Sequence, residues 1–175
     1  SPIKQSGSLP VDNMNTLSYL ITNKNDFFKI DYIYDILKEC GEDMYHQYGL
    51  VHWLNPYPKE AIRLDCENND VYLVYNCDIP VATFQLSEQI LKGKQTIHIN
   101  KFATRPIYSN RGIGKSMMKF VTDKSLEKNI GWISLDVYTE SLHAIEFYKN
   151  LGFEIIEKKP TKRFAVYKMM KNIDR

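Results

Sequence analysis

The segment with the clearest capacity for chemistry is Ser109-Asn110-Arg111-Gly112-Ile113-Gly114-Lys115-Ser116. It follows an extended apolar run and precedes an amphipathic helical pattern, so it would form the mouth of a helix. Glycines at such a position let the main chain approach a ligand closely. The first amides of a helix lack internal partners, and the helix dipole favours anions. The segment therefore predicts a site for a phosphorylated ligand that is held mainly by backbone.

One kind of phosphate site that fits this segment is the nucleotide-binding loop G-x-x-x-x-G-K-[ST], whose ending matches Gly114-Lys115-Ser116. The strand-like run Ile133 to Asp136 also imitates a strand that ends in a magnesium-binding aspartate. However, Ser109 stands where the leading glycine belongs, and the motif comes too late in the chain for the usual doubly wound nucleotide-hydrolase core. A P-loop-type nucleotide-binding protein is therefore the weaker alternative.

Hydrophobic periodicity predicts the elements that position this segment. Strand-like runs cover residues 17–22, 71–75, 81–86, 96–104, 132–138, 153–157 and 164–169. Helical spacing covers residues 28–48, about 58–66, 113–130 and 144–151. The strand before the glycine segment, the helix after it and the strand that follows form the pattern of a right-handed βαβ crossover, so the two strands should be parallel.

The upstream part of the chain predicts a different pairing. Asn76-Cys77-Asp78 has turn chemistry and separates two β-rich runs, which indicates an antiparallel hairpin. The predicted fold class is therefore mixed α/β (α+β), with an antiparallel first half and a parallel crossover in the second half of one sheet. Helices should cover the sheet.

A second motif makes the glycine segment more specific. Ser141-Leu142-His143-Ala144-Ile145-Glu146-Phe147-Tyr148-Lys149-Asn150-Leu151-Gly152-Phe153 is similar to N-x-x-A-x-x-F-Y-x-x-x-G-F, and Ser109 to Gly114 fits the spacing [QR]-x-x-G-x-[GA]. These are the two signatures of the Gcn5-related N-acetyltransferase (GNAT) superfamily, which the stretch from Phe102 to Phe153 resembles. The chain departs from the pattern at Ser109, where Gln or Arg is usual, and at Ser141, where Asn is usual.

The resemblance implies a central mixed sheet of about six to seven strands with helices on both faces, and acetyl-coenzyme A as co-substrate without a metal. The pantetheine arm would lie against the strand through Phe102 and Thr104, and the diphosphate would meet amides of residues 111–115. Arg111 and Lys115 are candidate charge partners of the outer phosphates. The implied cofactor contacts are Phe102, Ala103, Thr104, Ser109, Asn110, Arg111, Gly112, Ile113, Gly114, Lys115, Ser116, Ser141 and Tyr148.

Acetyl transfer to an amine needs a neutral nucleophile. A lysine-like amine with a pKa of about 10.4 is neutral in only about one molecule in 2,500 at pH 7, a cost of roughly 4.6 kcal/mol. A base must therefore act on the amine, and Glu88 and His98 are the candidates that can hold a proton, with Gln85 and Asn100 beside them. Tyr148, at the tyrosine position of the resembled family, is the candidate acid that returns a proton to the thiolate.

Composition bounds the remaining possibilities. The 175 residues carry 23 basic and 21 acidic side chains, a formal charge of +2, so no nucleic-acid partner is expected. The three cysteines have no metal-type spacing, and no apolar run reaches the ~20 residues of a membrane helix. We expect a cytoplasmic protein that is a monomer or homodimer. Residues 14–175 should form one N-acetyltransferase domain, and residues 1–13 a flexible tail whose native origin the sequence leaves open.

The sequence therefore predicts an acetyl-coenzyme A-dependent N-acetyltransferase that moves an acetyl group directly to a primary amine of a small molecule or peptide. A second alternative is a relative that binds acyl-coenzyme A but has lost catalysis. Amino acids, polyamines, antibiotics, peptide termini and lysine side chains all stay open as the acceptor.

Overall fold

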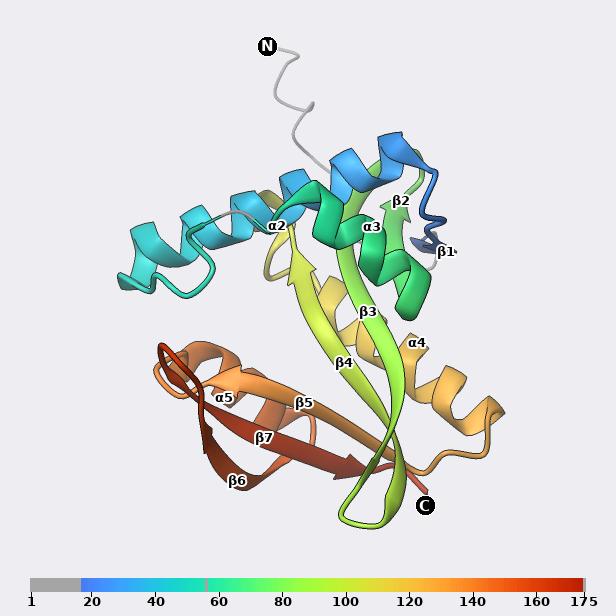
Figure 1. Ribbon diagram of the computed structural model, residues 1–175, viewed down its shortest axis with the longest axis vertical. Helices are drawn as coiled ribbons and strands as arrows, with labels where there is room; N and C mark the ends of the chain where they lie inside the picture. Colours follow the sequence, from blue (N-terminus) through green and yellow to red (C-terminus); the bar gives the residue numbers. More distant parts are fainter. Residues whose placement is uncertain (1–16, 56, 175) are drawn as a thin grey trace.

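The computed structural model describes residues 17–55 and 57–174 (Figure 1). The tail predicted over residues 1–13 lies outside them. The strands are β1 (Leu17–Ile21), β2 (Asp70–Asn76), β3 (Ile79–Leu91), β4 (Lys94–Thr104), β5 (Trp132–Tyr138), β6 (Glu154–Pro160) and β7 (Ala165–Asn172). The helices are α2 (Phe27–Tyr48), α3 (Lys59–Asn68), the 3₁₀ turn η2 (Pro106–Tyr108), α4 (Ile113–Glu127) and α5 (Leu142–Asn150).

The strands form one seven-stranded sheet in the order β1-β2-β3-β4-β5-β7-β6. Every pairing is antiparallel except that of β4 with β5, which is parallel and joined by α4. The predicted mixed α/β sheet, antiparallel first and then crossing over in parallel, is confirmed.

Helices cover both faces of the sheet, as the hydrophobic clusters show. Tyr72 and Val74 of β2 pack in the same cluster as Met117 of α4, whereas Val71 and Leu73 of the same strand pack with residues of α2 and α3. This alternation follows from the two-residue period of a strand. In Figure 1, α4 and α5 lie behind the sheet, while α2 and α3 lie in front of its upper part. Among the described residues, no helix lies in front of β5, β7 and β6 in this view.

The β3–β4 hairpin is longer than the sequence suggested. The two strands stay paired out to Leu91 and Lys94, where Lys92 and Gly93 make a turn with φ of 52° and 76°. Two left-handed residues in a two-residue turn match the twist of the flanking strands. The polar run that begins at Ser87 resembled a loop in the sequence, but its pairing partner β4 holds it in the sheet.

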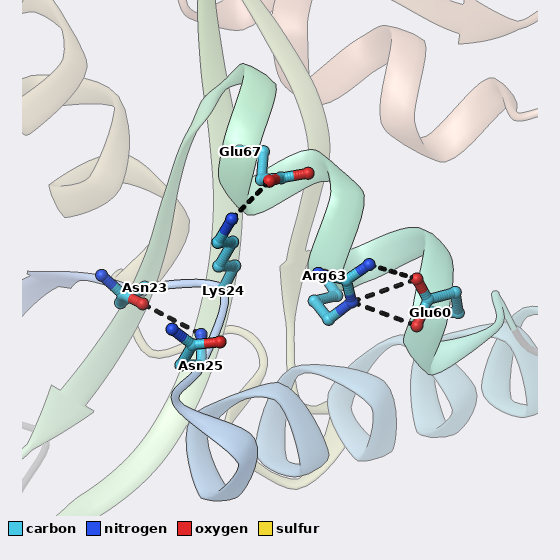
Figure 2. A network of polar contacts seen from close by, with 6 residues as sticks. All are labelled: Asn23, Lys24, Asn25, Glu60, Arg63 and Glu67. Atoms are coloured by element: carbon cyan, nitrogen blue, oxygen red, sulfur yellow. Dashed lines mark hydrogen bonds and ion pairs between the residues drawn. The ribbon is translucent and has the colours of Figure 1, made fainter.

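Polar contacts fasten α3 to the turn that precedes α2 (Figure 2). Lys24 Nζ donates to Glu67 at 2.6 Å, and Asn23 accepts a hydrogen bond from the Asn25 amide at 2.9 Å. Arg63 and Glu60 pair along α3 itself, at 2.5 Å. Both ion pairs are exposed to solvent, so neither contributes much to stability. Of the two pairs, it is Lys24–Glu67 that ties α3 to the turn before α2.

α2 ends at Gly49, whose φ of 72° turns the chain out of the helix and whose amide donates to the Tyr45 carbonyl. Glycine suits this left-handed position because it has no Cβ. The segment that follows runs back over the end of α2 toward α3. No helix within the described residues has the length and apolar character needed to cross a membrane.

Candidate active site

The site begins where β4 and β5 separate. Their parallel pairing covers only Ile97, Ile99 and the residue between them, opposite Ile133 to Leu135. Beyond Ile99 the strands diverge, and residues 100–104 stay paired only on their β3 side, through Asn100, Ala103 and Thr104. The other edge of this backbone therefore has donors and acceptors for a ligand, apart from the Thr104 carbonyl, which accepts a hydrogen bond from Cys40 Sγ at 3.1 Å.

Two cavities with shared walls open at this gap. The inner cavity has a volume of about 510 Å³ and the outer cavity about 550 Å³. Their shared wall residues are Met44, Trp53, Phe102, Ser141 and Ala144. The further walls of the inner cavity come from the segment after α2, from β4, β5 and α5, and from the β6–β7 loop, including His52, Tyr57, Asn100, Lys101, Asp136, Tyr138, Tyr148 and Phe164. Volumes of this size suit small organic ligands.

The outer cavity gathers six of the thirteen residues predicted to hold the cofactor. Phe102, Ala103, Thr104, Ser109, Asn110 and Ser141 all line it. The loop before α4 has two residues with left-handed backbone, Asn110 with φ of 60° and Gly112 with φ of 84°. They turn the chain so that α4 starts at Ile113, directly beside the cavity wall.

The start of α4 offers unpaired backbone amides. The first hydrogen bond of this helix runs from the Ser116 amide to the Gly112 carbonyl at 3.0 Å. The amides of Ile113, Gly114 and Lys115 therefore precede the hydrogen-bonded part of the helix. Arg111 is half-buried, with its guanidinium 5.9 Å from the centre of the Tyr108 ring, and Lys115 is exposed.

Gly114 has a packing role that the sequence did not reveal. A Cβ at this position would lie 3.0 Å from the ring of Phe147 on α5, which is tighter than ordinary contacts allow. The second glycine of the motif therefore lets α4 and α5 approach each other. Gly112, with its left-handed φ, is the glycine that shapes the loop itself.

Helix α5 places Tyr148 beside the gap between β4 and β5, and Ser141 lies just before this helix. Tyr148 is buried, lines the inner cavity and packs edge-on against Phe102 of β4, with ring centres 6.1 Å apart. Burial raises the pKa of Tyr148, so its hydroxyl stays protonated. Ser141 precedes the first turn of α5 and is also buried.

His98 belongs to a polar network on the open face of the sheet, behind the inner cavity. His98 Nδ1 and Ser134 Oγ share a hydrogen bond of 2.7 Å, and His98 Nε2 lies 3.9 Å from the Asp136 carboxylate. Burial lowers the pKa of His98, and the attraction of Asp136 opposes this. His98 is thus a buried imidazole that reaches the cavity through Asp136, which is a wall residue.

Asp136 is the centre of this network, although no sequence motif marks it as a base. Lys168 Nζ donates to its carboxylate at 3.2 Å, and Lys159 Nζ lies 3.9 Å away. Asp136 sits on β5 just past the last residue paired with β4, so its position follows from the point of divergence. The sequence did indicate a strand that ends at Asp136, but that pattern resembled a magnesium-binding aspartate rather than a base.

Glu88, the other candidate base, lies elsewhere. It is an exposed residue of β3 whose carboxylate accepts a hydrogen bond from Lys128 at 3.1 Å. It borders a separate polar cavity between the ends of α3 and α4, which Tyr148, His98 and Asp136 do not line. The structure therefore does not bring Glu88 together with Tyr148.

The Asp136–Lys168 pair gives a first prediction. Asp136→Asn should lower the free energy of unfolding by about 1–3 kcal/mol, because Lys168 is buried and its ammonium would lose its carboxylate partner. Urea denaturation measures this. The double variant Asp136→Asn, Lys168→Met should recover most of the loss. Glu42→Gln, which breaks the exposed pair with Lys38, should cost under ~0.5 kcal/mol. An equal loss in the double variant would show that the charge pair is not the cause.

The fold is shared with solved acetyltransferases. The ribosomal-protein-S18-alanine N-acetyltransferase of Escherichia coli superimposes with a TM-score of 0.66 at 16% identity, covering 91% of this chain and 95% of that one. Ard1 of Thermoplasma volcanium gives 0.68 at 18% identity, covering 91% and 99%. The PaiA N-acetyltransferase of Thermoplasma acidophilum, solved with coenzyme A, gives 0.69 at 14% identity, covering 89% and 98%. A search among curated proteins found no match.

The sequence itself matches the profile described as "Acetyltransferase (GNAT) family" over residues 30–153, well over half of the chain. The match includes the glycine segment, the divergence of β4 and β5, and α5 with Tyr148. It confirms the resemblance and the acyltransferase class predicted from the two motifs. The chain belongs to the GNAT family of acetyltransferases.

Proposed function

We propose that this protein transfers the acetyl group of acetyl-coenzyme A directly to a primary amine. The observation that carries the proposal is the divergence of β4 and β5, because it joins the outer cavity beside the glycine segment to an inner cavity lined by Asp136 and Tyr148. Two ligands that approach from these two cavities would meet at the gap. That arrangement suits direct transfer without a covalent enzyme intermediate.

The cofactor would be held mainly by backbone. Its pantetheine arm would pair with the edge of residues 102–104 that faces away from β3, much as an added strand would. Its diphosphate would accept hydrogen bonds from the amides at the start of α4, with Arg111 and Lys115 close enough in the chain to add positive charge. The structurally similar PaiA N-acetyltransferase was solved with coenzyme A, which supports coenzyme A as a ligand of this fold.

The acceptor amine would lose its proton in the inner cavity. Asp136 is an ionisable wall residue there, and the neutral His98 imidazole lies 3.9 Å behind it. The carboxylate would attract and orient the ammonium group and accept its proton directly or through one water molecule. His98 would act as the positioning partner of Asp136. Tyr148 would then donate a proton to the departing thiolate.

A thermal-shift comparison tests the cofactor. Coenzyme A and acetyl-coenzyme A, without added metal, should each raise the unfolding temperature, because a ligand at 100 times its Kd adds about 2.7 kcal/mol to the stability of the folded state. ATP with Mg²⁺ should give a smaller shift or none. Stabilisation by ATP–Mg²⁺ but by neither coenzyme form would support the nucleotide-loop alternative and overturn the proposal. Coenzyme binding without amine-dependent thiol release would instead identify a catalytically inactive relative.

A further inference from the structure

The inner cavity holds a lysine that the reaction outlined above does not use. Lys101 follows Asn100 on β4, in a bulge that lies between the Gln85–Asn100 and Thr83–Ala103 pairs. Its φ is 51°, a left-handed backbone that a lysine adopts only at a cost in energy. The bulge turns Lys101 into the wall of the inner cavity.

The ammonium group of Lys101 contacts an aromatic ring but forms no ion pair among the described residues. Its Nζ lies 4.0 Å from the centre of the Tyr57 ring, a cation–π contact at the cavity wall. Within residues 17–55 and 57–174, no carboxylate lies within the 4.0 Å that defines an ion pair with this ammonium. Asp65 attracts it from farther away, and that carboxylate accepts a hydrogen bond from Gln85 at 2.8 Å. Burial lowers the pKa of Lys101, so an incoming anion would relieve the loss of hydration.

The carboxylate on the cavity wall, by contrast, already has lysine partners. Asp136 has Lys168 at 3.2 Å and Lys159 at 3.9 Å. The other basic residue in the cavity wall is His52. Burial lowers the pKa of His52, so it adds no positive charge near neutral pH. A cavity with one engaged carboxylate and one cation that lacks a carboxylate partner is unfavourable for a polyamine, whose second ammonium group would meet Lys101.

We propose that the acceptor is a small amine that also carries a carboxylate, such as an amino acid, with the amine toward Asp136 and the carboxylate bound by Lys101. This inference rests on the proposed function and names the substrate class of the same site. The side chain of such an acceptor would lie against the rings of Trp53, Tyr138 and Phe164, which line the same cavity. The volume of about 510 Å³ accommodates a molecule of that size.

Matched product pairs test the recognition of the carboxylate without requiring turnover. The affinity of the protein for N-acetylated amino acids with aromatic, aliphatic and polar side chains would be measured with coenzyme A present. Each value would be compared with the affinity for the corresponding N-acetylamino acid amide, which lacks only the charged carboxylate. At least one acid should bind about 10-fold or more tightly than its amide, as expected for a charge-assisted hydrogen bond in a partly buried site. If every amide binds as tightly as its acid, the inference is overturned.

Variants connect the preference to Lys101. The acid-to-amide ratio should fall to about one in Lys101→Met and persist in Lys101→Arg, which keeps the charge. Lys94→Met is the matched control, because Lys94 lies on the same strand, with its Nζ 5.1 Å from the Trp132 ring centre, and outside both cavities. A ratio that survives in Lys101→Met would assign the preference to another group and overturn the inference.

Failure of the carboxylate-bearing acceptor can be distinguished from failure of the proposed function. Stabilisation by coenzyme A with no acid-to-amide preference would contradict the carboxylate-bearing acceptor and leave the cofactor proposal intact. An absence of any coenzyme A binding would contradict the proposed function itself. Acetyl transfer to polyamines or peptides at a higher kcat/KM than to every amino acid tested would also overturn the substrate class.

Discussion

Replacing Gly112 with aspartate is expected to weaken coenzyme A binding by at least about 100-fold, or roughly 2.7 kcal/mol. Gly112 has a φ of 84° and stands directly before α4. A side chain there would obstruct the approach of a diphosphate to the helix amides, and its carboxylate would repel the phosphate charge. Aspartate is a favoured residue before a helix, so α4 itself should persist. Isothermal titration with coenzyme A measures the effect.

Gly93→Asp is the control for backbone strain. Gly93 has a similar φ of 76°, lies at the tip of the β3–β4 hairpin, and has open space around a Cβ. Both substitutions impose about the same left-handed cost, on the order of 1 kcal/mol. Gly93→Asp should therefore lower stability to a similar degree and leave coenzyme A affinity unchanged. Equal affinity losses in the two variants would indicate that strain, rather than the position of Gly112, is responsible.

Replacing Tyr148 with phenylalanine is expected to lower kcat by about 100-fold or more while the affinity for coenzyme A stays nearly constant. The phenylalanine ring can keep the contacts with Phe102 and Phe153, whereas the proton donor is lost. General acid catalysis commonly contributes about 10²- to 10⁴-fold. Because burial raises the pKa of Tyr148, its hydroxyl stays protonated throughout the range in which amines become neutral. Thiol release at saturating amine measures kcat.

The matched control removes a buried hydroxyl elsewhere. Tyr72 lies in β2, buried against Phe84 with ring centres 5.0 Å apart, and lines neither the inner nor the outer cavity. Tyr72→Phe should leave kcat unchanged. An unchanged kcat in Tyr148→Phe would remove the acid role, and a parallel loss of coenzyme A affinity would indicate that Tyr148 positions the cofactor instead.

The elements of the fold could be predicted because local pattern and tertiary environment agree. The strand at residues 132–138 was predicted to the residue, since its apolar run is bounded by Gly131 and lies fully inside the sheet. The missed part is the outer half of the β3–β4 hairpin. Its residues alternate between half-buried and exposed, so their pairing depends on the Lys92-Gly93 turn rather than on burial.

The site was predictable only in part, for a different physical reason. The sequence motifs marked the glycine segment and Tyr148, whose cofactor and catalytic roles stay predictions. Lys101 and Asp136 gave no comparable signal, because each becomes a cavity residue only through the bulge in β4 and the end of its pairing with β5. Glu88 was selected from its sequence neighbourhood, but the length of the hairpin places it beside Lys128 instead.

The most direct test is a coupled assay with acetyl-coenzyme A and a panel of amines that follows free thiol and the mass of the amine together. Direct transfer predicts that thiol appears only when a suitable amine is present, in equal amount to an N-acetylated product whose mass has risen by one acetyl group. Both should fall in Tyr148→Phe and Gly112→Asp. Coenzyme A binding with no amine-dependent thiol, or thiol released without acetylated amine, would contradict acetyl transfer to a primary amine.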